Sequence, residues 1–199
     1  MSPESGSLPI HPQAVSVRAR ASRIRLVLFD VDGVLTDGKV LIHADGTESK
    51  QFDIKDGAAI AWAQRAGLAV GFLSARTSAA TSQRAAQLGV TRVHQGVSRK
   101  IDAYGEMLND SGLSDAAVAY MGDDLLDLPV LGRVGLAAAP ADAAYEVKAR
   151  VHWVSPARGG QGAARQLIEI ILRAQGHWDP LLASMTANTS DSEALGSKT

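Results

Sequence analysis

Short apolar runs alternate with longer amphipathic stretches through the middle of the chain, and this pattern predicts the fold. Apolar runs of strand length occur at 26–29, 68–73, 90–93, 117–121, 134–138 and 151–154. Helices are expected between them, at 56–65, 78–88, 98–109, 142–148 and 163–175, from their capping residues and closing glycines. Because strands that alternate with helices form parallel sheets, we expect an α/β fold with a doubly wound parallel sheet.

The segment after the first strand departs from this alternation. Strand-like runs at 39–43 and 48–54 flank Asp45 and Gly46, and an Asp-Gly pair in that position is a hairpin signal. A small β-hairpin insertion, instead of a helix, is therefore expected after the first strand. Because a two-stranded ribbon is marginally stable alone, we expect it to pair with copies of itself from other subunits.

Length, charge and cysteine content narrow the class of protein. The chain has 199 residues and a net charge of −1, so one domain is the default and bulk charge indicates neither nucleic acid nor a membrane as partner. It contains no cysteine, and its apolar runs are shorter than the ~20 residues of a membrane helix. The N-terminus lacks the apolar core of a signal peptide. These features favour a cytoplasmic protein.

Both ends of the chain are poor in large apolar residues. Residues 1–22 are expected to form an N-terminal extension, disordered at first and followed by a short basic helix over 14–22. Residues 178–199 are small and polar, which predicts a disordered C-terminal tail. The folded domain is thus expected to span 23–177.

Two carboxylates follow the first buried strand. Asp30 and Asp32 come directly after the run 26–29 and are followed at once by Gly33. Ligands bind beyond the carboxyl ends of strands in open parallel sheets, so both acids are expected at a ligand site. Two neighbouring acids suit a divalent cation, or a division of labour between nucleophile and proton carrier. The alternative is a strand that merely ends in a polar turn.

Further polar side chains are expected at the same edge of the sheet. They are Ser74 after the second strand, Lys100 at the start of a helix, and Asp123, Asp124 and Asp127 after the run 117–121. A carboxylate nucleophile, a hydroxyl donor, a fixed cation and a metal-binding acid are what phosphoryl transfer requires, because positioning and charge neutralisation dominate that chemistry.

The order of these segments resembles a known family. Four motifs resemble those of haloacid dehalogenase superfamily phosphatases, namely DVDGVLTDG, LSARTS, SRK and GDDLLDLPVL. Further segments resemble the 3-deoxy-D-manno-octulosonate 8-phosphate (KDO 8-phosphate) phosphatases, namely TDG, FDIKDG, RAAQLGV and RGGQGAARQLIEIILRAQGHWD. The resemblance implies a haloacid dehalogenase-like (Rossmannoid) domain without a cap, a homotetramer formed through the hairpin, and Mg²⁺ as cofactor. It also implies hydrolysis of an anionic sugar phosphate in lipopolysaccharide precursor synthesis.

The resemblance also implies a role for each matching residue. Asp30 would be the nucleophile that forms an aspartyl-phosphate, and Asp32 the general acid that later acts as base. Ser74 would donate a hydrogen bond to a phosphate oxygen, and Lys100 would balance negative charge. Mg²⁺ would be held by the Asp30 carboxylate, the Asp32 main-chain carbonyl and Asp123. Either Asp124 or Asp127 would orient Lys100 or a water on the metal ion.

Substrate contacts follow from the resemblance alone. An anionic acid sugar needs cations for its carboxylate. The residues implied to line the substrate site are Asp53, Ile54, Lys55, Asp56, Gly57, Arg76 and Arg84. Arg158 and Arg165 are implied to reach the active site of a neighbouring subunit.

Three positions depart from the family pattern. Gln161 and Ala61 stand where the family usually has basic residues, and Ala75 replaces a common glycine after Ser74. Without basic residues at positions 61 and 161, the identity of the sugar is left open. The alternative is the same chemistry on a nine-carbon 2-keto-3-deoxy (sialic-acid-like) sugar phosphate. A more distant alternative is a phosphorelay receiver-type binding module, which also combines acids, a hydroxyl and a lysine on a similar sheet.

Overall fold

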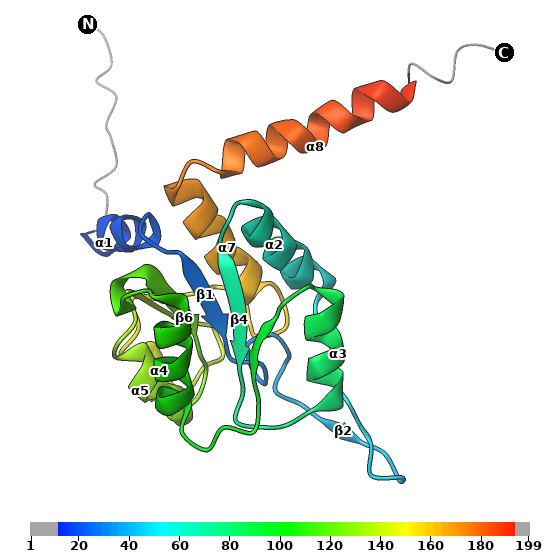
Figure 1. The fold of residues 1–199 in the computed structure, drawn as a ribbon, viewed down its shortest axis with the longest axis vertical. Coiled ribbons are helices and arrows are strands. Elements are labelled where there is room, and N and C mark those ends of the chain that lie inside the picture. The colour runs from blue at the N-terminus through cyan, green and yellow to red at the C-terminus, as the bar shows by residue number, and fades with distance from the viewer. Residues whose placement is uncertain (1–11, 194–199) are drawn as a thin grey trace, which may run out of the picture.

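A six-stranded sheet occupies the centre of the computed structural model, which describes residues 12–193 (Figure 1). The strand order is β5-β4-β1-β6-β7-β8, and all neighbours are parallel. The strands are β1 Leu26–Phe29, β4 Ala69–Leu73, β5 Arg92–His94, β6 Val118–Met121, β7 Leu136–Ala139 and β8 Trp153–Val154. The predicted doubly wound parallel sheet is confirmed, with β1 in its interior between β4 and β6.

Helices cover both faces of the sheet (Figure 1). They are α1 Pro12–Ala21, α2 Ile54–Arg65, α3 Ala79–Gln87, α4 Lys100–Ser111, α5 Leu128–Leu131, α6 Tyr145–Lys148, α7 Ala163–Ala174 and α8 Trp178–Glu193, with short 3-10 turns η1 Asp115–Ala117 and η2 Leu125–Asp127. Val27 and Phe29 face the core beneath α2 and α7, whereas Leu26 and Leu28 face the core beneath α4 and α5. This two-sided burial explains why β1 is a continuous apolar run.

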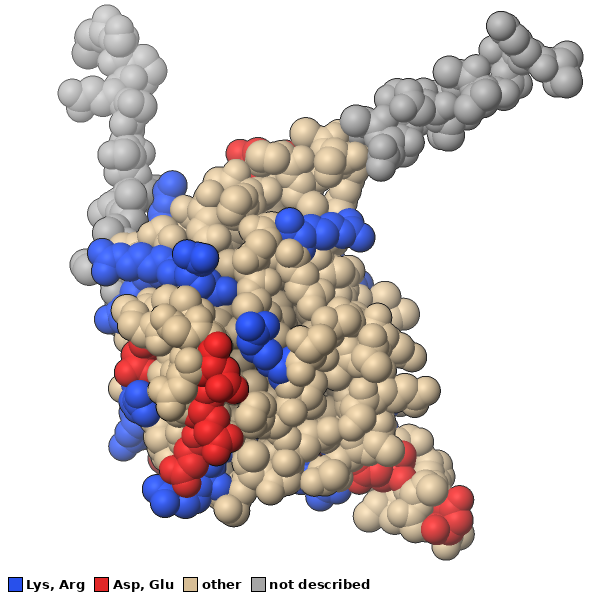
Figure 2. Space-filling view, viewed as in Figure 1, with Lys and Arg blue, Asp and Glu red and all other residues tan. Residues whose placement is uncertain are grey.

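The predicted hairpin is present and projects from the body of the domain (Figure 1). Strands β2 Leu41–Ile42 and β3 Glu48–Ser49 pair antiparallel around a turn in which Gly46 has φ +83°. Leu41 and Ile42 are 63% and 72% exposed, so the ribbon presents apolar side chains to solvent. Figure 2 shows acidic side chains at this projecting end and a second acidic group on the opposite side of the visible face, with small groups of Lys and Arg elsewhere on it.

Both ends of the described chain are helical. The expected basic helix is α1, and its Val17 and Ala21 are buried in the core beside α7, so this part of the expected extension belongs to the domain. Within the stretch expected to be a disordered tail, Trp178–Glu193 forms α8. The small, polar composition of this stretch predicted disorder, although it contains good helix formers. Trp178 anchors the helix, because its ring is buried edge-on against Trp62 with 5.9 Å between the ring centroids.

Residues 1–11 and 194–199 lie outside the described part. Within 12–193, each helix is too short or too polar to cross a bilayer.

Candidate active site

One cavity at the carboxyl ends of the central strands holds the predicted chemistry. Its volume is about 280 Å³, and it is lined by Asp30, Asp32, Gly38, Ser74, Ala75, Arg76, Lys100, Asp123, Asp124, Leu126 and Asp127. The sequence-predicted catalytic and metal residues therefore meet in one place. A larger hollow of about 970 Å³ lies between α1, β8 and α7 and contains none of these residues. A choice of site by cavity volume alone would therefore have missed the cavity that holds the predicted polar residues.

Asp30 sits where the sheet ends. Its main-chain N–H donates to the carbonyl of Met121 at 3.0 Å, so the ladder runs one residue past β1. Its carboxylate is buried, accepts from the N–H of Val31 at 2.7 Å and lies 2.9 Å from Nζ of Lys100. Burial and the neighbouring Asp127 raise the pKa of Asp30 to about 6, against the opposing effect of Lys100.

Lys100 is the first residue of α4 and lies between two acids. Its Nζ is 2.6 Å from Oδ1 of Asp127 and 2.9 Å from Oδ1 of Asp30, and its side chain is buried. Burial alone would lower the pKa of Lys100, but the Asp30 and Asp127 carboxylates together raise it. The lysine is therefore a fixed cation beside Asp30.

Asp127 organises the loop after β6. Its Oδ2 accepts from the N–H groups of Asp123 at 2.9 Å and Asp124 at 3.1 Å, while its Oδ1 accepts from Lys100 and from the hydroxyl of Tyr120. A Cβ on Gly122 would overlap the Asp127 side chain, which explains the glycine at that position. Of the two acids left open by the sequence, Asp127 contacts Lys100, whereas Asp124 caps η2 through the N–H of Leu125 at 2.8 Å.

Asp30, Asp123 and Asp127 form a group suited to a metal ion. Their ligand atoms lie within 4.8 Å of one another. Oδ1 of Asp123 is buried and finds no hydrogen-bond partner within the described residues, whereas both oxygens of Asp127 are engaged. Burial, Asp30 and Asp127 raise the pKa of Asp123 to about 8. Crowded, undersolvated carboxylate oxygens of this kind fit a divalent cation with oxygen ligands, such as Mg²⁺.

The loop after β1 is packed against two distant segments. Gly33 has φ +90°, and a Cβ there would overlap Oδ2 of Asp123. On another side, a Cβ on Gly159 would overlap the carbonyl of Gly33, and the N–H of Gly160 donates to the carbonyl of Val34 at 2.9 Å. Close backbone approach therefore requires glycine at positions 159 and 160.

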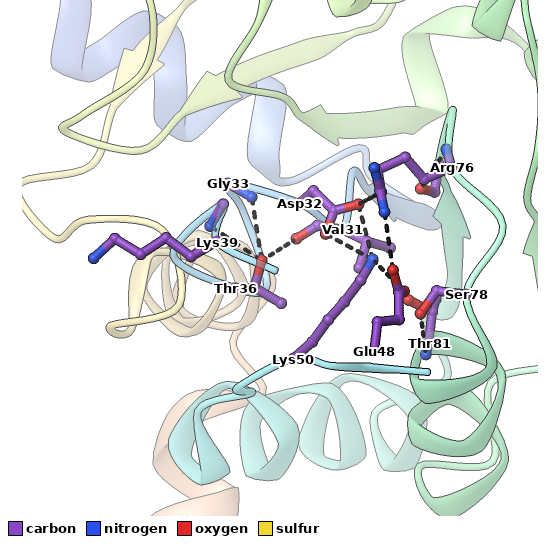
Figure 3. Close-up of polar contacts among 12 residues, drawn as sticks. Val31, Asp32, Gly33, Thr36, Lys39, Glu48, Lys50, Arg76, Ser78 and Thr81 are labelled. Atoms are coloured by element: carbon purple, nitrogen blue, oxygen red, sulfur yellow. Dashed lines mark hydrogen bonds and ion pairs between the residues drawn. The ribbon is translucent and has the colours of Figure 1, made fainter. Parts of the chain in front are cut away.

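Asp32 contacts a lysine that the sequence reasoning did not identify as a site residue. Nζ of Lys50 lies 2.7 Å from Oδ1 and 2.9 Å from Oδ2 of Asp32 (Figure 3). Nε of Arg76 is 3.8 Å from the same carboxylate. The sequence contained one indication of this contact. Glu48 and Lys50 are two residues apart in a strand-like run, so their side chains are expected on the same side of it.

Ser74 and the turn that follows β4 lie as predicted. Ser74 is buried at the cavity wall, and its Oγ accepts from the N–H of Arg76 at 3.2 Å. Ser78 is the N-cap of α3, where its Oγ accepts from the N–H of Thr81. Ala75, one of the departures from the family pattern, also lines the cavity.

The segment at the start of α2 lies outside the cavity. Asp53 caps α2 through the N–H of Lys55 at 2.7 Å, and Ile54 is 81% exposed. Arg84 packs against Gly57, donates to the carbonyl of Asp53 at 3.3 Å, and does not line the cavity within this chain.

Asp56 has a structural contact in this chain. It is buried and accepts from the N–H groups of Arg165 at 2.8 Å and Gly162 at 3.3 Å, at the start of α7. Burial raises the pKa of Asp56 to about 6. The side chain of Arg165 lies 2.7 Å from Glu169, and Arg158 lies 3.3 Å from Asp142. Neither arginine lines the cavity of its own chain.

The fold and the cavity assign the chain to a class. An acid pair that ends a central parallel strand, opposed by a lysine and a third acid, agrees with the resemblance of the sequence motifs to haloacid dehalogenase superfamily phosphatases. A structure from Legionella pneumophila that is described as a hydrolase of this superfamily superposes with a TM-score of 0.85 at 34% identity, covering 88% of this chain and 96% of that one. No family model matches the chain.

Named relatives narrow the class. The chain is 39% identical over 168 residues to 3-deoxy-D-manno-octulosonate 8-phosphate phosphatase KdsC of Escherichia coli strain B, covering 84% of this chain and 89% of the relative. The Moraxella catarrhalis phosphatase of that name, solved with a magnesium ion, a phosphate ion and KDO, superposes with a TM-score of 0.83 at 31% identity, covering 85% of this chain and 97% of that one. The chain belongs to the 3-deoxy-D-manno-octulosonate 8-phosphate phosphatase family, and is thus a phosphoric monoester hydrolase.

Proposed function

We propose that this chain hydrolyses KDO 8-phosphate to the free sugar acid and phosphate, with Mg²⁺ and through an aspartyl-phosphate on Asp30. The observation that carries the proposal is the contact of Asp30 with Lys100 in a cavity that also holds Asp32, Ser74 and Asp123. Family membership supplies the substrate, because its named relatives are phosphatases of this ester.

The residues of the chain account for each bond change. A carboxylate oxygen of Asp30 attacks phosphorus, and the bond from phosphorus to the sugar oxygen breaks. Asp32 gives its proton to the departing sugar oxygen. A water molecule then attacks the phosphoryl group and passes a proton to Asp32, so that phosphate leaves and Asp30 is restored.

Charge neutralisation makes the first attack possible, because nucleophile and phosphate are both anionic. Lys100 holds a positive charge 2.9 Å from Asp30, and an opposite charge at about 4 Å is worth a few kcal/mol at an effective dielectric near 20. Ser74 donates a hydrogen bond to a phosphate oxygen. Asp30 and Asp123, with the main-chain carbonyl of Asp32, would hold Mg²⁺, which supplies further neutralisation of the phosphoryl oxygens.

The remaining substrate contacts are proposed to form between subunits. Arg76 lines the cavity of its own chain. The segment 53–57, Arg84, Arg158 and Arg165 do not, so they would meet the sugar acid only across a homotetramer assembled through the hairpin. The exposed Leu41 and Ile42 are the apolar surface available for that contact. We place the reaction in the cytoplasm, in lipopolysaccharide precursor synthesis.

Phosphate release from a panel of sugar phosphates, with and without Mg²⁺, tests this proposal. KDO 8-phosphate should give the highest kcat/KM, chelation should abolish turnover, and Asp30→Asn should reduce it by at least about 10³-fold. Wild-type activity in Asp30→Asn would remove Asp30 from the nucleophile role.

A nine-carbon 2-keto-3-deoxy sugar phosphate remains the second candidate substrate, because Ala61 and Gln161 stand where basic residues are usual. The ratio of kcat/KM for the two esters separates them. Membership of a phosphatase family counts against the receiver-type binding module that the sequence left open.

A further inference from the structure

Each acid of the catalytic pair has a lysine of its own. Asp30 contacts Lys100 at the start of α4. Asp32 contacts Lys50, which directly follows β3 (Figure 3). Lys50 reaches both oxygens of Asp32, at 2.7 and 2.9 Å. The hairpin of the same chain therefore supplies a side chain to the active site.

The Lys50 side chain is held where an ammonium group is costly. It is 0% exposed, whereas Asp32 and Glu48 keep about a fifth of their side-chain surface. Removing an ammonium from water carries a desolvation cost of several kcal/mol unless partners offset it. A lysine that served only to keep the hairpin polar would leave its head group in solvent. Full burial against Asp32 indicates a specific contact.

A second acid and an arginine complete the arrangement. Glu48 places Oε1 3.9 Å from Nζ of Lys50 and Oε2 2.9 Å from Nη2 of Arg76. The hydroxyl of Ser78, followed by Arg76 and Lys50, lowers the pKa of Glu48. Glu48 thus ties the hairpin to the turn after β4, and Lys50 extends from that fixed point to Asp32 (Figure 3).

We propose that Lys50 is a positioning residue for the proton transfer made by Asp32. Its two contacts hold the Asp32 carboxylate in one orientation at the cavity, where the sugar oxygen departs from phosphorus. The inference rests on the proposed function, since it assumes that Asp32 protonates the leaving group. It gives the hairpin a catalytic purpose within its own chain, separate from any role in assembly.

Leaving groups of different basicity test this role. A sugar alkoxide needs a proton as it departs, whereas 4-nitrophenolate does not, and general acid catalysis is worth about 10²–10⁴-fold. Lys50→Met should therefore lower kcat for KDO 8-phosphate by about 10²-fold or more, while kcat for 4-nitrophenyl phosphate should change by less than about threefold. KM for both esters should change little. Lys50→Arg, which keeps the charge, should retain more turnover of KDO 8-phosphate than Lys50→Met.

Lys39→Met is the matched control, because Lys39 belongs to the same insertion but is 86% exposed. It should leave both reactions unchanged. A double-mutant cycle then asks whether Lys50 acts through Asp32: added to Asp32→Asn, Lys50→Met should cost nothing further. The double variant removes the buried ammonium and its carboxylate partner together. If Lys50→Met alone does not fold, the double variant can therefore still be compared with Asp32→Asn.

Three results would overturn the proposal. One is an equal loss on both esters, another is a loss confined to KM, and the third is a full additional loss in the Asp32→Asn background. Failure of the proposed function would look different, because the wild-type protein would then not cleave KDO 8-phosphate at all. In that case the same leaving-group comparison is made with the best alkyl phosphate of the panel.

Discussion

Gly33 and Asp123 lie so close together that a Cβ on Gly33 would overlap Oδ2 of Asp123. The two residues belong to loops after neighbouring strands, β1 and β6. Gly33 also has φ +90°, a conformation that residues with side chains rarely adopt. The backbone of one acidic loop therefore forms the wall against which Asp123, the proposed metal ligand of the other loop, rests.

Gly33→Ala should displace Asp123 and weaken Mg²⁺ activation by at least about tenfold, besides the cost of about 1–2 kcal/mol for a side chain at positive φ. Gly46→Ala is the matched control, since Gly46 has φ +83° and a Cβ on it would meet no atom within 4 Å. It should cost stability alone. Mg²⁺ titrations of phosphate release and urea unfolding give the two quantities. Unchanged Mg²⁺ activation in Gly33→Ala would contradict the packing argument.

Asp127 and Tyr120 should differ sharply when substituted. Asp127→Ala leaves Lys100 without one of its two acids and frees two main-chain N–H groups, so the free energy of unfolding should fall by roughly 3–5 kcal/mol and turnover by orders of magnitude. Tyr120→Phe removes one hydrogen bond, worth about 1 kcal/mol, and keeps the ring in the core. Urea unfolding and phosphate release measure both. Equal effects of the two variants would show that Asp127 does not organise the site.

Mg²⁺ binding should release protons near neutral pH. In the metal-free protein, burial and neighbouring carboxylates raise the pKa of Asp123 to about 8, so this group is largely protonated at pH 7. A divalent cation favours the ionised form, so affinity for Mg²⁺ should rise with pH up to about 8 and then level off. Calorimetry in two buffers of different ionisation enthalpy gives the proton count. Asp123→Asn should remove most of the release at pH 7, leaving only a small part from Asp30, whose pKa is about 6. A pH-independent affinity of the wild-type protein would refute the prediction.

Asp56 should make the fold less stable as pH rises. Burial raises its pKa from an ordinary value of 3.8 to about 6, so the folded protein holds the proton more tightly than the unfolded chain. Its contribution is fully present below about pH 4 and is lost as pH rises through about 6, a change of about 3 kcal/mol. Urea unfolding of Asp56→Asn against wild type should show this difference, whereas the exposed Asp110→Asn should not. A flat difference between pH 4 and 7 would contradict it.

Much of the fold follows from local pattern. The buried strands β1, β4 and β6 are continuous apolar runs, and the acids that follow β1 and β6 mark the ligand-binding edge without any knowledge of tertiary structure. The hairpin followed from Asp45 and Gly46. These predictions hold because each depends on residues that are neighbours in sequence.

The features that sequence could not predict depend on contacts between distant segments. Lys50 reaches Asp32 only because the base of the projecting hairpin lies beside the loop after β1. Asp127 and Asp124 look equivalent in sequence, and only the turn of η2 decides which one faces Lys100. Trp178 fixes the start of α8 through Trp62, a contact that composition cannot reveal. In each case a tertiary partner determines the role.

The seating of Gly159 and Gly160 on the loop after β1 has a consequence for biosynthesis. The loop after β1 leaves the ribosome long before residues 159 and 160, whose backbone supports it. A nascent chain halted before this support emerges would expose the acidic loop with one wall missing. The loop after β1 therefore reaches its final packing only once residues 159 and 160 have been synthesised and have folded against it.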